Sequence, residues 1–169
     1  GGRLSADFAS PYYASGGKLY VVDIEDKTNP EIISETQLSA VESFDGEGRE
    51  FWSEGQIRLL NGIVYFGLQG SEYIETAEGQ HRWMARHWLG QVDLNDPANP
   101  QKLSLVEIPG TFENVIDNGS GGVVLFSSVY KSYYEKEVWH NAFSVQASAF
   151  DGVTAYLIDE LVDEDSNYG

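Results

Sequence analysis

The sequence predicts an all-β protein of antiparallel strands, and three observations support that prediction. Aromatic residues make up 13% of the 169 residues, which together with 18 glycines is typical of strands joined by many turns. Two similar phrases, VDIEDKTNP at residues 22–30 and VDLNDPANP at residues 92–100, each separate two strand-like runs. Asn61-Gly62 separates a further pair of such runs, and this dipeptide favours the type I′ turn of a two-residue hairpin.

Each of the two phrases is expected to connect antiparallel strands. Residues 18–21 and 31–38 flank the first copy, and residues 87–91 and 101–108 flank the second. Asp, Asn and Pro stabilise local turns, and Pro cannot donate a hydrogen bond to a strand ladder. The phrases are therefore interpreted as turns that mark structural repeats, and not as metal-binding or catalytic motifs.

The C-terminal third of the chain predicts further strands. A turn through residues 117–122 separates strand-like residues 112–116 from residues 123–128. Apolar and polar side chains then alternate over residues 143–149. That alternation predicts a half-buried strand whose apolar residues share one face.

Asp151-Gly152 is expected to form the tight turn of the last hairpin, after which residues 153–161 return. An alternative register aligns Ile158-Asp159 with Val22-Asp23 and makes the acidic C-terminal tail the connector. Asp-Gly is a strong hairpin signal, so the first register is the favoured one.

These strands and turns divide the chain into similar four-stranded units. The predicted parts are, in order, the end of one unit over residues 1–40, an acidic, Gly-rich linker over 41–53, a second unit over 54–110, a third unit over 111–162 and an acidic tail over 163–169. Inserts at residues 71–86 and 131–141 follow the second strand of the second and third units. We expect each insert to form an extended hairpin or loop, both projecting from the same face.

Consecutive four-stranded antiparallel units are the blades of a β-propeller. A closed ring holds about four to eight blades, so the sequence predicts an incomplete section of a larger ring. Other parts of the same polypeptide or other chains would complete it, since open sheets leave strand edges unpaired. The chain starts at Gly1 with no Met or signal peptide, which we interpret as an excised piece of a longer polypeptide. A compact β-sandwich is the alternative fold.

Four stretches resemble one known group of proteins. They are residues 19–24 with Asn29-Pro30, residues 92–100, residues 107–110 and residues 146–153. Together they resemble secreted bacterial β-propeller proteins, namely the LVIVD-repeat proteins and the C-terminal β-propeller domains distantly related to WD40 repeats. The first phrase departs from the family pattern, with Lys27 and Thr28 where the second has Pro97 and Ala98. The resemblance implies a propeller fold and a secreted, periplasmic or cell-surface location, and it supplies no catalytic motif.

Composition excludes several classes of function. The formal charge is −17, from 27 acidic and 10 basic residues, so the surface repels nucleic-acid phosphates and anionic lipid. Cysteine is absent, which excludes disulfides, thiolate metal sites and cysteine catalysis. The sequence has no apolar run of the roughly 20 residues that a transmembrane helix needs.

A cluster of cationic and aromatic residues over residues 81–88 is the main candidate binding site. The candidate residues, including two from the second insert, are His81, Arg82, Trp83, Arg86, Trp88, Trp139 and His140. Such side chains suit an anion, a sugar or an aromatic ligand. In the alternative interpretation the cations pair with nearby acids and the tryptophans pack between blades.

Two metal sites are weaker candidates. His81 and His87 would share a face in an extended strand, with His140 in the corresponding insert, but spacing identifies no third ligand. Oxygen donors for calcium occur at Asp163, Asp165 and Asn167. Tyr168 stands where a calcium loop has Gly, so a solvated acidic tail is the alternative, and no other cofactor is identified.

Two classes of function remain. The first is a non-enzymatic scaffold that binds protein or glycan through the aromatic inserts. The second is a propeller enzyme, a hydrolase or an oxidoreductase, with its site in the central channel. The sequence contains no Gly-x-Ser-x-Gly elbow or phosphate-binding loop, which favours the scaffold. An activity screen of the complete polypeptide, with and without calcium, separates the two.

Overall fold

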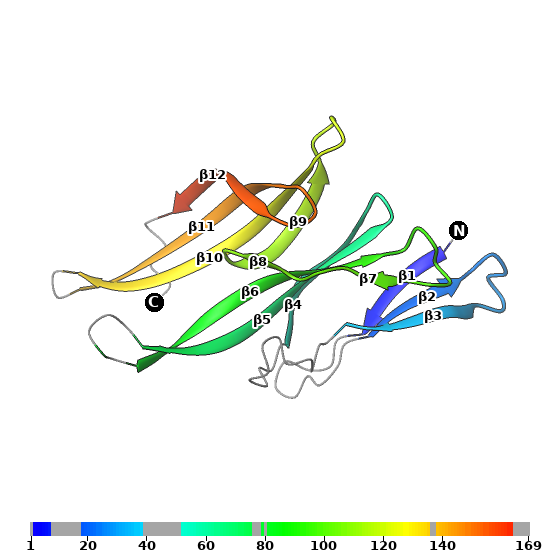
Figure 1. The fold of residues 1–169 in the computed structure, drawn as a ribbon, viewed down its shortest axis with the longest axis horizontal. Helices are drawn as coiled ribbons and strands as arrows, with labels where there is room; N and C mark the ends of the chain where they lie inside the picture. Colours follow the sequence, from blue (N-terminus) through cyan, green and yellow to red (C-terminus); the bar gives the residue numbers. More distant parts are fainter. Residues whose placement is uncertain are drawn as a thin grey trace.

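The computed structural model describes residues 2–7, 18–38, 52–75, 79, 81–135 and 138–163. The strands in these ranges form three antiparallel sheets (Figure 1). Sheet A contains β1 (Gly2–Asp7), β2 (Lys18–Asp23) and β3 (Glu31–Gln37) in that order. Sheet B contains β4 (Trp52–Leu60), β5 (Ile63–Glu75), β6 (His81–Asp93) and β7 (Gln101–Lys102), and β8 (Val106–Ile108) also pairs with β6. Sheet C contains β9 (Thr111–Asp117), β10 (Val123–Glu135), β11 (Val138–Phe150) and β12 (Ala155–Asp163) in that order.

The prediction of an all-β, antiparallel protein is confirmed. The described ranges contain only strands, turns and loops, and thus no helix that could cross a membrane. Most of the predicted linker, residues 41–51, lies outside the described ranges, and the linker's last two residues belong to β4. Of the predicted acidic tail only Asp163 is described, and it is the last residue of β12.

The hairpin turn between β4 and β5 is the one predicted from Asn61-Gly62. Both residues have positive φ, 50° and 77° respectively. A type I′ turn needs positive φ at both central positions, and Asn and Gly tolerate it. The Asn61 amide also donates a hydrogen bond to Asp117 Oδ2 over 3.2 Å, so this turn contacts the neighbouring sheet C.

The two repeated phrases connect β2 to β3 and β6 to β7, as predicted, but the strand expected over residues 101–108 is divided into β7 and β8. In the two phrases, the hydrogen bonds from backbone N–H groups to aspartate carboxylates correspond one to one. The carboxylate of Asp23 accepts from the backbone N–H two residues later, as does that of Asp93, both over 2.8 Å. Asp26 and Asp96 likewise each accept from the backbone N–H two residues later, over 2.9 Å and 3.1 Å. These hydrogen bonds stabilise the turns, so the aspartates have a structural role in them.

The last hairpin has the favoured register. The Asp151 carboxylate accepts hydrogen bonds from the N–H groups of Val153 and Thr154, at 2.9 Å and 2.7 Å. β11 and β12 then pair from Phe150 opposite Ala155 onward. Asp151-Gly152 is thus the turn of the last hairpin, whereas the acidic tail that the alternative register makes the connector lies, beyond Asp163, outside the described residues.

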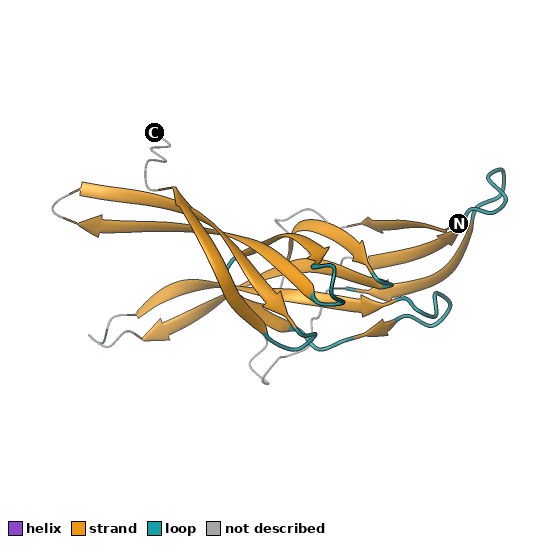
Figure 2. Cartoon of the chain, turned by 90° about the horizontal axis from the view of Figure 1, so that it is seen from above, coloured by secondary structure: helices purple, strands orange, loops and turns teal. Residues whose placement is uncertain are grey.

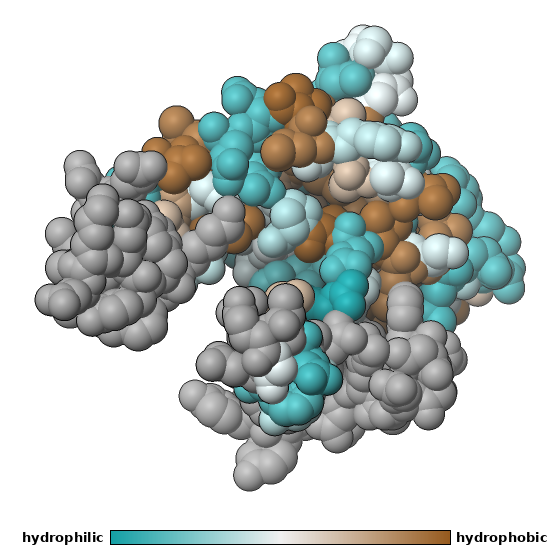
Figure 3. Space-filling model, turned by 60° about the vertical axis from the view of Figure 1, so that its left-hand side comes forward, coloured by the Kyte–Doolittle hydropathy of each residue, from teal (hydrophilic) through white to brown (hydrophobic). Residues whose placement is uncertain are grey.

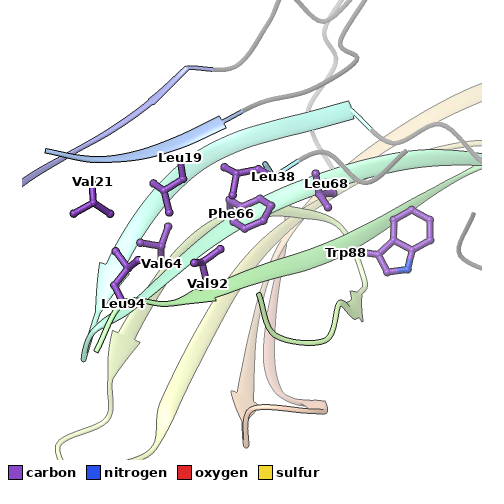
Figure 4. Packing of buried hydrophobic residues seen from close by; sticks show 9 residues of the cluster. All are labelled: Leu19, Val21, Leu38, Val64, Phe66, Leu68, Trp88, Val92 and Leu94. Carbon is purple, nitrogen blue, oxygen red and sulfur yellow. The ribbon is translucent and has the colours of Figure 1, made fainter. Parts of the chain in front are cut away.

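Sheet B lies between sheets A and C, so each of its faces contributes to a hydrophobic core (Figure 2). The cluster that joins sheets A and B consists of Leu19, Val21, Leu38, Val64, Phe66, Leu68, Trp88, Val92 and Leu94, and Figure 4 shows these side chains between the two sheets. The cluster that joins sheets B and C consists of Tyr65, Leu89, Val106, Ile108, Phe112, Val115, Leu125 and Phe150. Neighbouring residues of β5 thus enter different cores, since successive side chains of a strand point to opposite faces.

The interface between sheets B and C also contains polar groups. The Tyr65 and Phe150 rings meet edge to face, with centroids 6.4 Å apart, and burial raises the pKa of the Tyr65 hydroxyl. Gln91 is buried, and its amide donates to the backbone oxygens of Ser104 and Gly152, each over 3.3 Å. Gly152 belongs to the turn before β12, so Gln91 links the two sheets as well as filling the core.

The buried face of β11 differs from the one that its sequence pattern favours. Residues 143–149 do form a strand, but the side chains that face sheet B are Ser144, Gln146, Ser148 and Phe150. Three of these four are polar. Ser144 and Ser148 are small, and the Gln146 amide donates a hydrogen bond to Glu160 Oε1 over 2.8 Å. The apolar alternates lie on the opposite face, which no described sheet covers. Alternation predicts which residues share a face, whereas the neighbouring sheet decides which face is inside.

Gly90 allows the packing between sheets A and B. A Cβ atom at this position would lie 2.2 Å from Cζ of Phe66, which sits directly opposite in the ladder. The Phe66 ring therefore occupies the space that a side chain at residue 90 would need.

Gly90→Ala should lower the free energy of unfolding by about 1–3 kcal/mol, the usual cost of overpacking a core. Urea denaturation measures this loss. In the double variant Gly90→Ala/Phe66→Leu the smaller side chain makes room for the new methyl group, so the combined loss should be smaller than the sum of the single losses. Strictly additive losses would contradict the proposed contact.

Stability should fall in acid because of the turn aspartates. Hydrogen bonds from the Thr28 side chain to Asp26, and from the Asn99 side chain to Asp96, lower the pKa of each carboxyl group below its usual value. A lowered folded pKa stabilises the protein above the unfolded pKa of about 3.9, and this stabilisation disappears as pH falls through the folded pKa. Urea midpoints should decline below about pH 4, and less steeply in Asp96→Asn. Equal slopes in the two proteins would refute the assignment.

Candidate functional site

The candidate site lies at the ends of two long hairpins, β5–β6 and β10–β11. In each hairpin 13 residues of one strand pair without interruption with 13 residues of the other. The predicted inserts at residues 71–86 and 131–141 are the outer parts of these ladders, apart from residues outside the described ranges. Both hairpins extend toward the same end of the molecule, on the left in Figures 1 and 2, away from the two repeated connectors.

The outer part of β5–β6 carries a stacked pair of rings. The ring centroids of Tyr73 and His81 lie 5.2 Å apart, and the ring planes are 11° from parallel. Tyr73 is 57% exposed, and His81 is also exposed. The two residues are diagonal neighbours, since His81 lies opposite Glu75 and Tyr73 lies opposite Trp83. An exposed pair of flat rings suits stacking against a sugar, an aromatic group or a cation.

Arg86 and Trp88 belong to the packed part of β6. Trp88 is 5% exposed and lies in the core between sheets A and B. Arg86 Nη2 lies 2.5 Å from Glu107 Oε2, and Arg86 Nε donates to Glu107 Oε1 over 2.9 Å. The Arg86 guanidinium is also 5.9 Å from the centre of the Trp88 ring. For these two residues the structure shows the alternative interpretation, in which the cation pairs with an acid and the tryptophan packs between sheets.

The other predicted binding residues lie farther out on the two ladders. The opposing pairs are Arg82 with Ile74, Trp83 with Tyr73, Trp139 with Tyr134 and His140 with Tyr133. His140 is exposed. In the backbone register of both ladders, aromatic residues therefore occupy opposing positions.

The histidines do not form a common metal site. His81 and His87 lie six positions apart in β6, which in an extended strand separates them by about 20 Å. Two histidines bind one zinc ion only when both nitrogens lie about 2 Å from it. Within the described ranges, no group of three or more His, Asp or Glu residues is placed to hold a metal ion.

The calcium candidate in the acidic tail is described only in part. Asp163 lies opposite Phe143 at the end of β12. Asp165 and Asn167 lie outside the described residues. A calcium site at this position stays a prediction.

Two features of the structure were not identified from the sequence. The first is Tyr73, which stacks on His81 although it lies eight residues before the cluster that the sequence singles out. The second is β12, an edge strand on which eight of nine residues are exposed and several of these are large and apolar. The run AYLIDELVD mixes apolar and acidic residues without strict alternation. The sequence therefore indicates neither which face of this strand is buried nor how far its side chains are exposed.

Comparison of the chain with protein-family models, with curated proteins and with solved structures finds no match. The resemblance to bacterial β-propeller proteins therefore stays a prediction. It rests on the repeated connectors and on the hairpins that flank them.

Proposed function

We propose that sheets A, B and C are consecutive blades of a β-propeller, and that the protein is a non-enzymatic scaffold that binds protein or glycan. The proposed binding elements are the outer parts of β5–β6 and β10–β11, and the proposed location is secreted, periplasmic or on the cell surface. One observation carries the proposal: the three sheets stack in chain order, and corresponding strands turn the same face toward the next sheet.

The repeated phrases define which residues correspond. They align Leu19 and Val21 of β2 with Leu89 and Gln91 of β6. Leu19 and Val21 pack toward sheet B, the next sheet along the chain. Leu89 likewise packs toward the next sheet, sheet C, and Gln91 donates a hydrogen bond to Gly152 in the last turn of sheet C. A stack in which each unit contacts only its neighbours through equivalent faces is the arrangement of blades.

The first strands of sheets B and C also lie together. Arg58 of β4 donates from Nε to Asn114 Oδ1 of β9 over 2.8 Å. At the neighbouring turn, Asn61 donates to Asp117. In a propeller the first strands of adjacent blades meet near the central axis, so these contacts support the same assignment.

In sheets A and B, the face that points toward the next sheet along the chain is covered by that sheet. The equivalent face of sheet C is the one that points away from sheet B. Strand pairing places Ile116, Val124, Phe126, Phe143, Val145, Ala147 and Ala149 on this face. Ile116 and Phe143 are 42% and 39% exposed, which is unusual for residues of an otherwise apolar sheet face. In the proposed ring a further blade covers them.

Hydroxyl-radical footprinting of the 169-residue chain by itself and of the native protein purified from its source tests the ring. Ile116 and Phe143 should be oxidised readily in the isolated chain and several-fold more slowly in the native protein, because a further blade excludes solvent from them. Val153, 71% exposed in the turn before β12, should react equally in both and is the internal control. Equal oxidation of Ile116 and Phe143 in both samples contradicts the ring.

Truncation of the β5–β6 hairpin tests the binding role. In the truncated variant an Asn-Gly turn replaces residues 72–84 and joins Ser71 to Ala85, which lie directly opposite each other. This change retains the Arg86–Glu107 ion pair and the core around Trp88. Binding on a glycan array and to a displayed peptide library should fall at least about tenfold, the loss of about 1.4 kcal/mol or more expected when a stacking platform is removed.

The matched control for this truncation is Pro97→Lys/Ala98→Thr, which gives the second connector the residues of the first. It alters the opposite end of sheet B and should bind as the wild type does. Both variants should keep the wild-type urea midpoint within error. Unchanged binding by the truncated variant would remove the hairpin from the proposed function.

A further inference from the structure

The outer strand of sheet C, β12, differs from the outer strands of the other two sheets. β12 is nine residues long and ends its sheet, with β11 as its one strand partner in the described part of the chain. In sheet B the outer position is divided between two short strands, β7 and β8, of two and three residues. In sheet A the outer strand β3 is tied to sheet B, because Ser34 Oγ donates to the Pro97 carbonyl oxygen over 2.6 Å. β12 is therefore the longest of the three outer strands, and its pairing with β11 shifts register between Ala147 and Ser148.

β12 exposes apolar side chains on both of its faces. Pairing with β11 places Tyr156 and Leu161 on the face that points away from sheet B, and they are 58% and 77% exposed. Leu157 and Val162 lie on the other face and are 59% and 47% exposed. Figure 3 shows apolar residues at the surface of the upper part of the molecule, beside hydrophilic ones. An apolar edge strand is a template for pairing with another strand, and within β12 the Glu160 N–H donates to Asp159 Oδ1 over 2.9 Å.

The charge of β12 indicates which kind of strand could pair with its outer edge. Its nine residues include Asp159, Glu160 and Asp163 and no Lys or Arg. Asp159 and Asp163 share a face with Leu161, whereas Glu160 accepts a hydrogen bond from Gln146 on the other face. Pairing two copies of β12 would bring like charges together, and each chain carries a formal charge of −17. A cationic strand is the complementary occupant.

We propose that β12 is the docking edge for an extended segment of another protein, in which apolar residues alternate with Lys or Arg. The segment adds a strand to sheet C. Its backbone groups pair with the outer edge of β12, a cation lies beside Asp159, and its apolar residues pack on Leu157 and Val162. Strand addition makes affinity depend on backbone pairing, and the alternate side chains determine specificity. This site is separate from the hairpin ends, so the outcome of its test is independent of the hairpin-truncation result.

A nine-residue peptide of alternating Val and Lys, blocked at both ends, is the probe. Titrated into the 169-residue chain, it should shift and protect the backbone amides of residues 155–163 in NMR spectra. Binding should weaken about tenfold or more when salt rises from about 50 mM to 500 mM, because the cations and carboxylates are exposed. The same peptide with Glu in place of Lys should bind at least about tenfold more weakly.

Two controls separate strand addition from attraction to an acidic surface. Proline at the central Val of the peptide removes a backbone donor and should abolish the protection of β12 amides while leaving the peptide's charge unchanged. In the protein, Leu157→Lys/Leu161→Lys should weaken binding at least tenfold, whereas Val153→Lys should leave affinity within about twofold, since Val153 lies in the turn outside the strand. Far-UV circular dichroism and urea midpoints check that the variants fold.

Three results would overturn the proposal. The first is peptide-induced shifts that lie mainly outside β12. The second is equal binding by the proline peptide and the unmodified one, which would indicate attraction to charge alone. The third is a chain that sediments as a dimer without peptide, with β12 amides already protected, which would make a second copy the occupant.

Discussion

Burial of the β5–β6 hairpin on both faces is the constraint on which the rest of the structure depends. Val64 and Phe66 face sheet A, while Tyr65 and Leu89 face sheet C, so one hairpin contributes to both cores. Neither outer sheet has another described layer to pack against. Gly90 is part of this constraint, because the Phe66 ring occupies the space of any larger residue there. Loss of packing in this hairpin would therefore be felt in all three sheets.

Interior packing also determines where interactions with other molecules can occur. The connectors use their aspartates and asparagines internally, in hydrogen bonds that hold the turns. Arg86 and Trp88 are engaged by Glu107 and by the core. Accessible places among the described residues include the Tyr73–His81 stack on β5–β6 and the edge strand β12. These places differ in chemistry, since the first presents flat rings and the second presents backbone groups, apolar side chains and carboxylates.

Local signals in the sequence were the reliable ones. Asn61-Gly62 and Asp151-Gly152 form turns between adjacent strands, and both repeated phrases connect antiparallel strands. Such turns depend on the φ preferences and short-range hydrogen bonds of a few neighbouring residues, which are properties of the sequence itself. The predicted cluster over residues 81–88 was only partly informative. Residue type suggests what a side chain can bind, but burial of Trp88 and pairing of Arg86 are set by strands far along the chain.

The sequence by itself therefore determined the strands, their antiparallel pairing through short connectors and the repetition of one connector. Only the tertiary structure decided which face of each strand is inside. In β11 the serines and Gln146 face sheet B, and the apolar alternates face away, although the alternation alone favours the reverse. The physical reason is that period-two patterning identifies two faces, whereas burial depends on which sheet stacks on which face. That stacking involves contacts between residues distant in the chain, and no local pattern encodes them.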